Sequence, residues 1–538
     1  MEKKLEFIGY IIGEASTTEF EFVTQKNYAP MKWDYLMIKS LEKSQNKKIE
    51  VQILAQVSEI YGFSKNVTID TLPSVVEKQI EQNIVNPKIY GKAKILGYID
   101  EKTPKNIIRI PRSNRLPGEK VYLAPNPLLE KFFSKKNIKG LYIGNLLTNE
   151  NVKVLLDPNG LNRHLAVIAQ TGAGKSYTAG VLIEELYKLG ASILVLDPHS
   201  DYVFLSQKAE DRSLVDRNQF IRVFRNPSST GRYSTDSIPN LRDYEINFAH
   251  LDEEDIAKVC YVPSNATRIK DKIREAIERI EEDNYSPERL INELSSLEEE
   301  AENSRQRGIC RSTLIRVRQL LRYQVFGNND IPIEEILKPW SISVIDLSGL
   351  TDNSMNYIAA NILNEAYRFI LSEADFPIFI IIEEAHRFIP PRFKKTTFCS
   401  QIINSIASEG RKFGLFLIMI TQRPSKIDPD SLSQCNSQII MKITNPEDQR
   451  AILTSSERAT EDLLNNLPGL SPGEAIITGD IVKVPVMVSV RERITKEGGA
   501  DIDILEKLEQ AKQNAEIDKD LEKERESQIN PRKEPFNI

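Results

Sequence analysis

The 538-residue sequence carries a net charge of −6 and contains 40% hydrophobic and 28% charged residues, a composition typical of a globular protein with two to four domains. This acidic balance gives no overall reason to expect nucleic-acid binding, so any basic surface must be local. No apolar run reaches the roughly 18 residues that span a bilayer, and the charged start shows no cleavable signal. The sequence therefore predicts a cytoplasmic protein without membrane contact.

The cysteines and histidines show no metal-binding pattern. His199 and His386 lack partners at metal-ligand spacing, so ordinary hydrogen-bonded side chains are expected there. The cysteines lie far apart, which favours free thiols in a reducing compartment over a zinc site. They are Cys260, Cys310, Cys399 and Cys435.

Residues 1–150 contain short runs of β-branched and aromatic residues that polar turns separate. This spacing predicts an antiparallel barrel or sandwich. No catalytic constellation occurs here, so we expect an accessory barrel for assembly or partner docking. The predicted strands are Phe7–Ile12, Phe20–Thr24, Tyr35–Ile38, Ile49–Val57, Lys92–Ile99 and Val121–Ala124.

A strand, a glycine-rich turn and a helix follow one another after residue 164. Leu165–Ala169 is an apolar strand, and Lys175 opens an apolar-periodic helix. In this P-loop layout Lys175 reaches the terminal phosphates of ATP, and the Ser176 hydroxyl binds Mg²⁺. Ala169 departs from the pattern, which has glycine there. The predicted nucleotide-binding residues are Gln170, Thr171, Gly172, Ala173, Gly174, Lys175, Ser176 and Tyr177.

Strands and helices alternate through residues 151–500, which predicts a parallel sheet covered on both faces. A helical insertion is expected at about 252–325, and residues 501–538 form a charged C-terminal tail. Helices are predicted at Asn356–Leu371 and Thr397–Ser408. The predicted strands are Ser192–Leu196, Ser341–Leu347, Phe376–Ile382, Leu415–Thr421, Gln438–Ile443 and Glu474–Thr478.

Polar residues follow three of these strands. Glu383 and Glu384 end an apolar strand, where the first acid of a P-loop ATPase commonly binds Mg²⁺ and the second activates water. We therefore assign Glu383 to the metal and Glu384 to the general base. Gln422 is predicted to sense γ-phosphate or the attacking water. Asp197 ends the second strand, at the edge where α/β sheets bind ligands.

Two arginines lie where they suit a role across a subunit boundary. Arg411 joins a helix to a strand, away from its own P-loop, and could stabilise transition-state charge in a neighbouring subunit. A plain contact with the helix end is the alternative. Arg163 precedes its strand, which makes a contact with ATP in its own subunit improbable. Arg423 could be a structural ion-pair partner.

The motifs together resemble the HerA–FtsK superfamily of ring-forming P-loop DNA translocases, and HerA more closely. The matching text is RHLAVIAQTGAGKS, LVLDPHSDY, IIIEEAHRFIP and EGRKFGLFLIMITQRPSKIDPDSLSQCNSQIIMKITNPEDQRAIL. The resemblance implies a RecA-like ATPase core, a homo-hexamer with duplex DNA in its channel, and partnership with a NurA-type nuclease at DNA ends. It also implies roles in the same subunit for Lys175, Asp197 and Glu384, and trans-acting arginines at Arg163 and Arg411.

The function expected is therefore ATP-driven DNA translocation or unwinding by a hexamer, with ATP and Mg²⁺ as cofactors. Arg392, Lys394 and Lys395 follow the acidic strand end and could supply positive charge in the channel. A protein-transporting ATPase of the secretion or conjugation type, or a nucleotide-gated assembly scaffold, would share the same core. DNA-stimulated ATPase activity distinguishes these alternatives.

Overall fold

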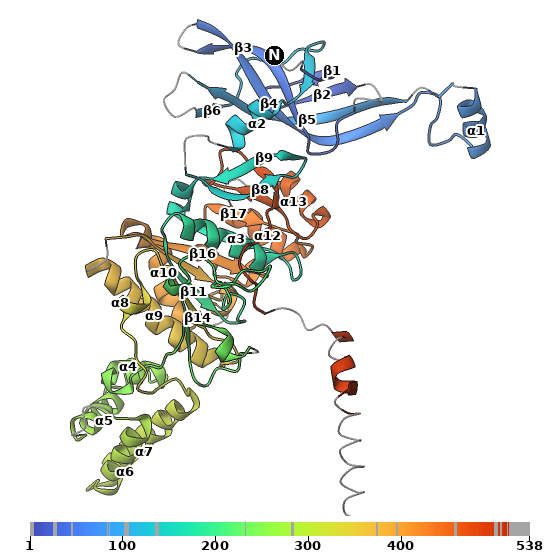
Figure 1. The fold of residues 1–538 in the computed structure, drawn as a ribbon. Helices are drawn as coiled ribbons and strands as arrows, with labels where there is room; N and C mark the ends of the chain where they lie inside the picture. The colour runs from blue at the N-terminus through green and yellow to red at the C-terminus, as the bar shows by residue number, and fades with distance from the viewer. Residues whose placement is uncertain are drawn as a thin grey trace, which may run out of the picture.

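A β-barrel, a large sheet and a helical insertion follow one another along the molecule, with the barrel and the insertion at opposite ends (Figure 1). The structure is a computed structural model. It describes residues 5–24, 29–44, 47–82, 84–85, 87–101, 107–134, 139–231, 233–280, 285–372, 375–393, 396–456, 460–499, 504–505, 508–513 and 515. Most of the tail expected at 501–538 therefore lies outside the described residues.

The N-terminal strands form a closed antiparallel barrel, as the sequence predicts. The strands run in the order β2-β1-β7-β3-β4-β5, and β2 pairs with β5 to close the ring, while β6 adds to β5 outside it. Closure pairs every edge of the barrel. Its members are β1 (Phe7–Ala15), β2 (Glu19–Thr24), β3 (Tyr35–Ser44), β4 (Lys47–Phe63), β5 (Lys88–Asp100), β6 (Ile107–Arg109) and β7 (Lys120–Leu123).

Two helices belong to this region, and the strand pattern did not predict them. α1 (Pro73–Glu81) connects β4 to β5 at the end of a long hairpin and buries none of its residues. α2 (Asn126–Phe133) buries four apolar side chains and packs against β9, between the barrel and the large sheet (Figure 1).

The large sheet has twelve strands in the order β13-β12-β14-β11-β15-β16-β10-β17-β18-β19-β8-β9. Pairing is parallel from β13 to β17 and antiparallel from β17 to β9, which confirms a mainly parallel α/β core. The strands are β8 (Leu141–Leu146), β9 (Asn149–Leu156), β10 (Leu165–Ile168), β11 (Ser192–Asp197), β12 (Ile221–Arg225), β13 (Leu241–Asp243), β14 (Ile342–Asp346), β15 (Ile378–Ile382), β16 (Leu415–Thr421), β17 (Ser437–Ile440), β18 (Glu474–Thr478) and β19 (Val486–Val490).

The pairing of β8 with β19 places residues 141–146 in the large sheet. A boundary at residue 150 would assign β8 to the barrel domain, so the expected division differs from the sheet pairing here. The difference arises because β8 reads locally as one more short strand, and its partner lies more than 300 residues further along the chain.

Helices cover both faces of the sheet, because alternate residues of its central strands enter two different apolar clusters. Ile193 and Val195 of β11 pack with α3, whereas Leu194 and Leu196 pack in the cluster that includes α9 and α10. The helices of the core are α3 (Lys175–Lys188), α8 (Ile333–Ile336), α9 (Asp352–Ser372), α10 (Phe398–Glu409), α11 (Pro429–Ser433), α12 (Pro446–Ser455) and α13 (Glu461–Asn466).

The helical insertion is present as expected and extends the cluster under α9 and α10. It comprises α4 (Glu253–Val259), α5 (Thr267–Glu278), α6 (Pro287–Glu299) and α7 (Ser304–Val317). α7 begins after Asn303, whose side chain caps the helix by accepting a hydrogen bond of 2.9 Å from Gln306 N–H.

Short 3-10 helices complete the structure: η2 (Pro158–Arg163), η3 (Asn218–Phe220), η4 (Thr235–Ser237), η5 (Phe248–His250), η6 (Arg318–Arg322), η7 (Ala385–Arg387), η8 (Gly410–Lys412), η9 (Pro424–Lys426) and η10 (Leu467–Gly469). The four cysteines are free and buried. Within the described ranges, every helix is too short or too polar to cross a membrane.

Candidate active site

The glycine-rich turn joins β10 to α3 as the sequence predicts. β10 ends at Ile168, and α3 begins at Lys175 directly after Gly174. Gly172 and Gly174 have φ values of 76° and 95°, in the left-handed region that favours glycine. Ala169 is fully buried at the strand end, where its methyl group is accommodated. The N-terminus of α3 therefore presents backbone N–H groups in the arrangement that binds an anion.

Lys175 lies between the two predicted acids. Its ammonium is 2.6 Å from Glu383 Oε1 and also contacts Glu384 Oε1. All three side chains are nearly inaccessible to solvent. Glu384 adopts a φ of 49°, which is unusual for a residue with a side chain and is typical of strained functional sites. The P-loop lysine and both acids after β15 therefore form one buried cluster.

Gln422 connects this cluster to the P-loop. β16, which precedes it, pairs directly with β10. The Gln422 amide oxygen accepts a hydrogen bond of 2.6 Å from Thr171 Oγ1, and its amide nitrogen donates one of 2.6 Å to Glu384 Oε1. A side chain that contacts both the turn and the proposed base is well placed to sense the nucleotide.

The acids differ in the pKa that their surroundings impose. Burial raises the pKa of both, but the neighbouring His386 and Lys175 outweigh it at Glu384 and hold its pKa at about 2. At Glu383 burial dominates, and the pKa lies above its usual value. The same carboxylates raise the pKa of Lys175 despite its burial. In this state Glu384 is fully ionised at neutral pH.

Asp197, for which the sequence predicts a catalytic role, forms hydrogen bonds within its own turn. Its buried carboxylate accepts hydrogen bonds from the backbone N–H groups of His199, Asp201 and Tyr202, at 2.8–3.1 Å. The carboxylate that reaches the P-loop is that of Asp201, which accepts a hydrogen bond of 2.7 Å from Ser176 Oγ. Asp197 therefore shapes the turn that presents Asp201.

The oxygen atoms around Ser176 fit Mg²⁺, a hard cation that prefers such donors. Ser176 Oγ and Asp201 lie at the turn. The buried Glu383 Oε1 forms an ion pair with Lys175, and among the described residues it has no hydrogen-bond partner. No group of three or more His, Cys, Asp or Glu side chains in the described part of the chain is arranged to hold a metal by itself. Mg²⁺ would therefore need phosphate oxygens as further ligands, as it commonly does.

Arg163 and Arg411 lie together, at the opposite end of the strands from the P-loop. Both line one open cavity of about 610 Å³, with Asn162, Ser408, Asn436 and others. Arg163 ends η2 before β10, and its Nε is 4.0 Å from Asp480 Oδ2. Arg411 lies in η8 before β16, and no hydrogen bond or ion pair engages its guanidinium among the described residues.

The predicted DNA contacts are described only in part. Lys394 and Lys395 lie outside the described residues. Arg392 is exposed, and its guanidinium is 3.5 Å from Asp428 and 3.8 Å from Asp430. These acids partly balance its charge. Arg423 is exposed beside the nucleotide end of β16.

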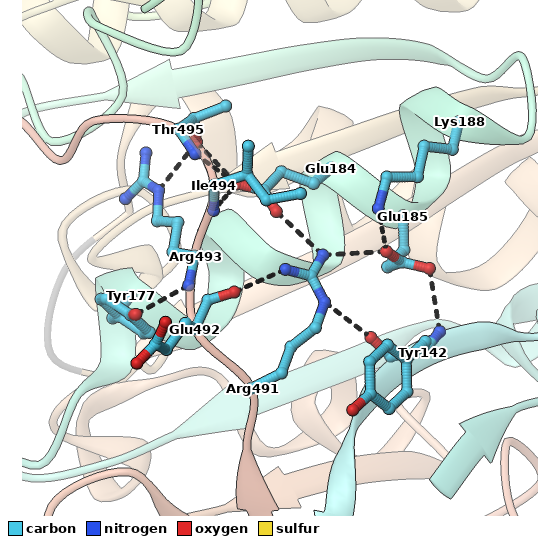
Figure 2. Close-up of polar contacts among 10 residues, drawn as sticks. All are labelled: Tyr142, Tyr177, Glu184, Glu185, Lys188, Arg491, Glu492, Arg493, Ile494 and Thr495. Atoms are coloured by element: carbon cyan, nitrogen blue, oxygen red, sulfur yellow. Dashed lines mark hydrogen bonds and ion pairs between the residues drawn. The ribbon is translucent and has the colours of Figure 1, made fainter. Parts of the chain in front are cut away.

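A C-terminal segment anchors α3, which sequence reasoning missed. Figure 2 shows Arg491–Thr495 crossing the helix, with Arg491 paired at 2.8 Å to both Glu184 and Glu185. The hydroxyl of Tyr177, a predicted nucleotide contact, accepts a hydrogen bond of 2.7 Å from Arg493 N–H. No local sequence pattern marks this contact, because about 310 residues separate its two sides.

Comparisons with known proteins show which proteins the chain resembles. The family model "Helicase HerA, central domain" matches residues 141–366. The probable helicase MJ1565 of Methanocaldococcus jannaschii is 32% identical over 93% of this chain and 94% of its own length. The DNA double-strand break repair helicase HerA of Pyrococcus furiosus is 29% identical over 95% and 98%. VirB4 of Thermoanaerobacter pseudethanolicus superposes with a TM-score of 0.46 at 14% identity, over 65% of this chain and 96% of that one.

Two observations lead to one assignment. The first is the near-complete coverage of the two helicase relatives, and the second is the P-loop with the acids that contact Lys175. The chain is a P-loop ATPase that belongs to the HerA family of helicases.

Proposed function

We propose that the protein is an ATP-driven DNA translocase or helicase that works as a hexameric ring with composite ATP sites. The observation that carries this proposal is the separation of the arginines from the P-loop of their own chain. β16 alone puts seven residues of extended chain between Arg411 and Gln422, roughly 23 Å at about 3.3 Å per residue. Arg411 can then serve a nucleotide only in a neighbouring subunit.

ATP binds at the turn between β10 and α3, where backbone N–H groups hold the phosphates. Lys175 reaches the terminal phosphates, and Ser176 with Glu383 would hold Mg²⁺, which supplies charge stabilisation to the transferring phosphoryl group when bound. Glu384 orients and deprotonates the attacking water. Gln422 positions Glu384 and this water relative to each other. Arg163 and Arg411 of the adjacent subunit stabilise the transition-state charge.

DNA is the proposed substrate, because several relatives are named as DNA double-strand break repair helicases. A ring needs positive potential only along its channel, so the net charge of −6 is compatible with a duplex held there. A NurA-type nuclease is the proposed partner in the processing of DNA ends.

Mixing two inactive variants tests the composite site. Lys175→Ala subunits retain both arginines, and Arg411→Ala subunits retain an intact P-loop. Under conditions that exchange subunits, the mixture should recover ATPase activity that neither variant shows alone. Exchange without recovery would place Arg411 outside catalysis.

The DNA part needs a separate measurement. Duplex DNA should raise the ATPase rate of the wild-type protein and leave Glu384→Gln inactive. A rate that stays the same at all DNA concentrations would favour a protein-transporting ATPase or an assembly scaffold instead.

A further inference from the structure

A buried histidine lies directly between the two arginine-bearing segments. His164 follows Arg163 in the chain, and its side chain is 2% exposed. Its Nδ1 accepts a hydrogen bond of 2.9 Å from the Leu417 backbone N–H, and its Nε2 is 3.0 Å from the Ala407 carbonyl oxygen. Because Nδ1 accepts, the proton of the neutral ring is on Nε2, which donates to Ala407.

These two contacts bracket Arg411. Ala407 belongs to the last turn of α10, Leu417 belongs to β16, and η8 with Arg411 lies between them. The His164 ring therefore contacts both ends of the segment that carries Arg411. The His164 backbone is bonded directly to Arg163. The backbone carbonyl of Arg163 also accepts a hydrogen bond of 3.0 Å from Asn436 N–H.

Among the described residues, few contacts hold the guanidinium groups of Arg163 and Arg411 in place. Within the described part of the chain, the Arg163 guanidinium has one ion pair, at 4.0 Å from Asp480, and its side chain is 52% exposed. Long exposed side chains are mobile, so their placement depends on the backbone that carries them. The backbone of His164 has a φ of 57°, which is unusual for a residue with a side chain.

We propose that His164 is a positioning residue that sets the geometry of Arg163 and Arg411 toward the neighbouring subunit's nucleotide. This inference rests on the proposed composite site. Burial lowers the pKa of His164, so the ring stays in the neutral form that accepts from Leu417. A displacement of about 1 Å in a group that stabilises the transition state can lower the rate about 100-fold.

Three variants separate the two hydrogen bonds of the ring. His164→Leu removes both, His164→Asn can keep the acceptor for Leu417 N–H, and His164→Gln can keep the donor to Ala407. We expect kcat to fall about 100-fold in His164→Leu with ATP affinity unchanged, and to fall less in the two amide variants. A loss of ATP affinity in parallel with kcat would overturn the proposal, because it would place the effect on the P-loop of the same chain.

Subunit mixing gives the decisive result, because His164 also begins the strand that leads to its own P-loop. If His164 positions the arginines, His164→Leu subunits should recover activity with Lys175→Ala and none with Arg411→Ala. If His164 supports its own P-loop, the pattern reverses and the proposal fails. Should His164→Leu not fold or assemble, His164→Asn and His164→Gln go through the same two mixtures.

The mixture of Lys175→Ala with Arg411→Ala is the control for the proposed function. Failure of that control with confirmed exchange removes the composite site itself. Recovery in the control, with no recovery in Lys175→Ala plus His164→Leu, overturns only the role of His164.

Discussion

Replacement of Glu184 by alanine should release the C-terminal segment from α3. Glu184 Oε1 accepts hydrogen bonds from Ile494 N–H at 2.9 Å, Thr495 N–H at 2.7 Å and Thr495 Oγ1 at 2.9 Å. Its Oε2 pairs with Arg491 at 2.8 Å, and the side chains of Glu184 and Arg491 are 5% and 10% exposed. The substitution therefore leaves two backbone donors and part of a buried cation without their partner.

The expected size of the effect follows from this count. Removal of one partner of a buried ion pair costs about 3–5 kcal/mol, and four lost contacts do not add beyond that range because they share one carboxylate. Arg491 keeps Glu185, which favours the lower end. At about 1.4 kcal/mol per tenfold change, the segment should open roughly 10²- to 10³-fold more often.

Hydrogen exchange measures this opening directly. In Glu184→Ala, the amides of Ile494 and Thr495 should exchange roughly 10²- to 10³-fold faster than in the wild type. Glu184→Gln is the matched control, since its amide oxygen still accepts from both N–H groups while the charge toward Arg491 is lost. It should show a smaller increase. Unchanged exchange in Glu184→Ala would show that other contacts hold the segment.

Three further outcomes are expected. Glu384→Gln should bind ATP and lose hydrolysis by about 10²–10⁴-fold in single-turnover assays, and a wild-type rate would remove this carboxylate from the mechanism. Combined removal of charge at Arg392, Lys394 and Lys395 should weaken DNA binding and flatten its salt dependence, whereas an unchanged salt slope would place the DNA contact elsewhere. Thermal stability should decline as pH falls below about 6.5, because His164 then binds a proton in the unfolded chain but not in the native protein, where its pKa is lowered. His164→Asn should reduce this decline. An equal decline in the variant would contradict the contribution of His164.

The core of the active site is predictable from the sequence because its signals are local. A strand, glycines and a helix start identify the turn at Lys175, and an apolar strand that ends in two acids identifies Glu383 and Glu384. Parallel strands then bring these residues together, because their carboxyl ends share one edge of the sheet. The contacts of Lys175 and Gln422 agree with that reasoning.

What the sequence did not predict depends on distant parts of the chain or on the direction of one side chain. Asp197 and Asp201 both lie in LDPHSD, and only the backbone turn decides that Asp201 faces Ser176. The pairing of β8 with β19 and the contact of Glu184 with Arg491 each join segments more than 300 residues apart. No periodicity or capping pattern encodes such partners.

The shared position of Lys175 has a consequence for the order of events in turnover. Its ammonium pairs with both Glu383 and Glu384 in this state, and a carboxylate with a pKa of about 2 is a poor proton acceptor. The phosphates of ATP carry more negative charge than either acid, so they compete for the same ammonium when the nucleotide binds. If Lys175 turns toward the phosphates, one of the two partners that lower the pKa of Glu384 would move away, while the hydrogen bond with His386 would remain. The pKa of the carboxyl would then rise from its low value. We therefore expect nucleotide binding to favour Glu384 as the proposed base, with Gln422, which contacts both the turn and Glu384, beside it.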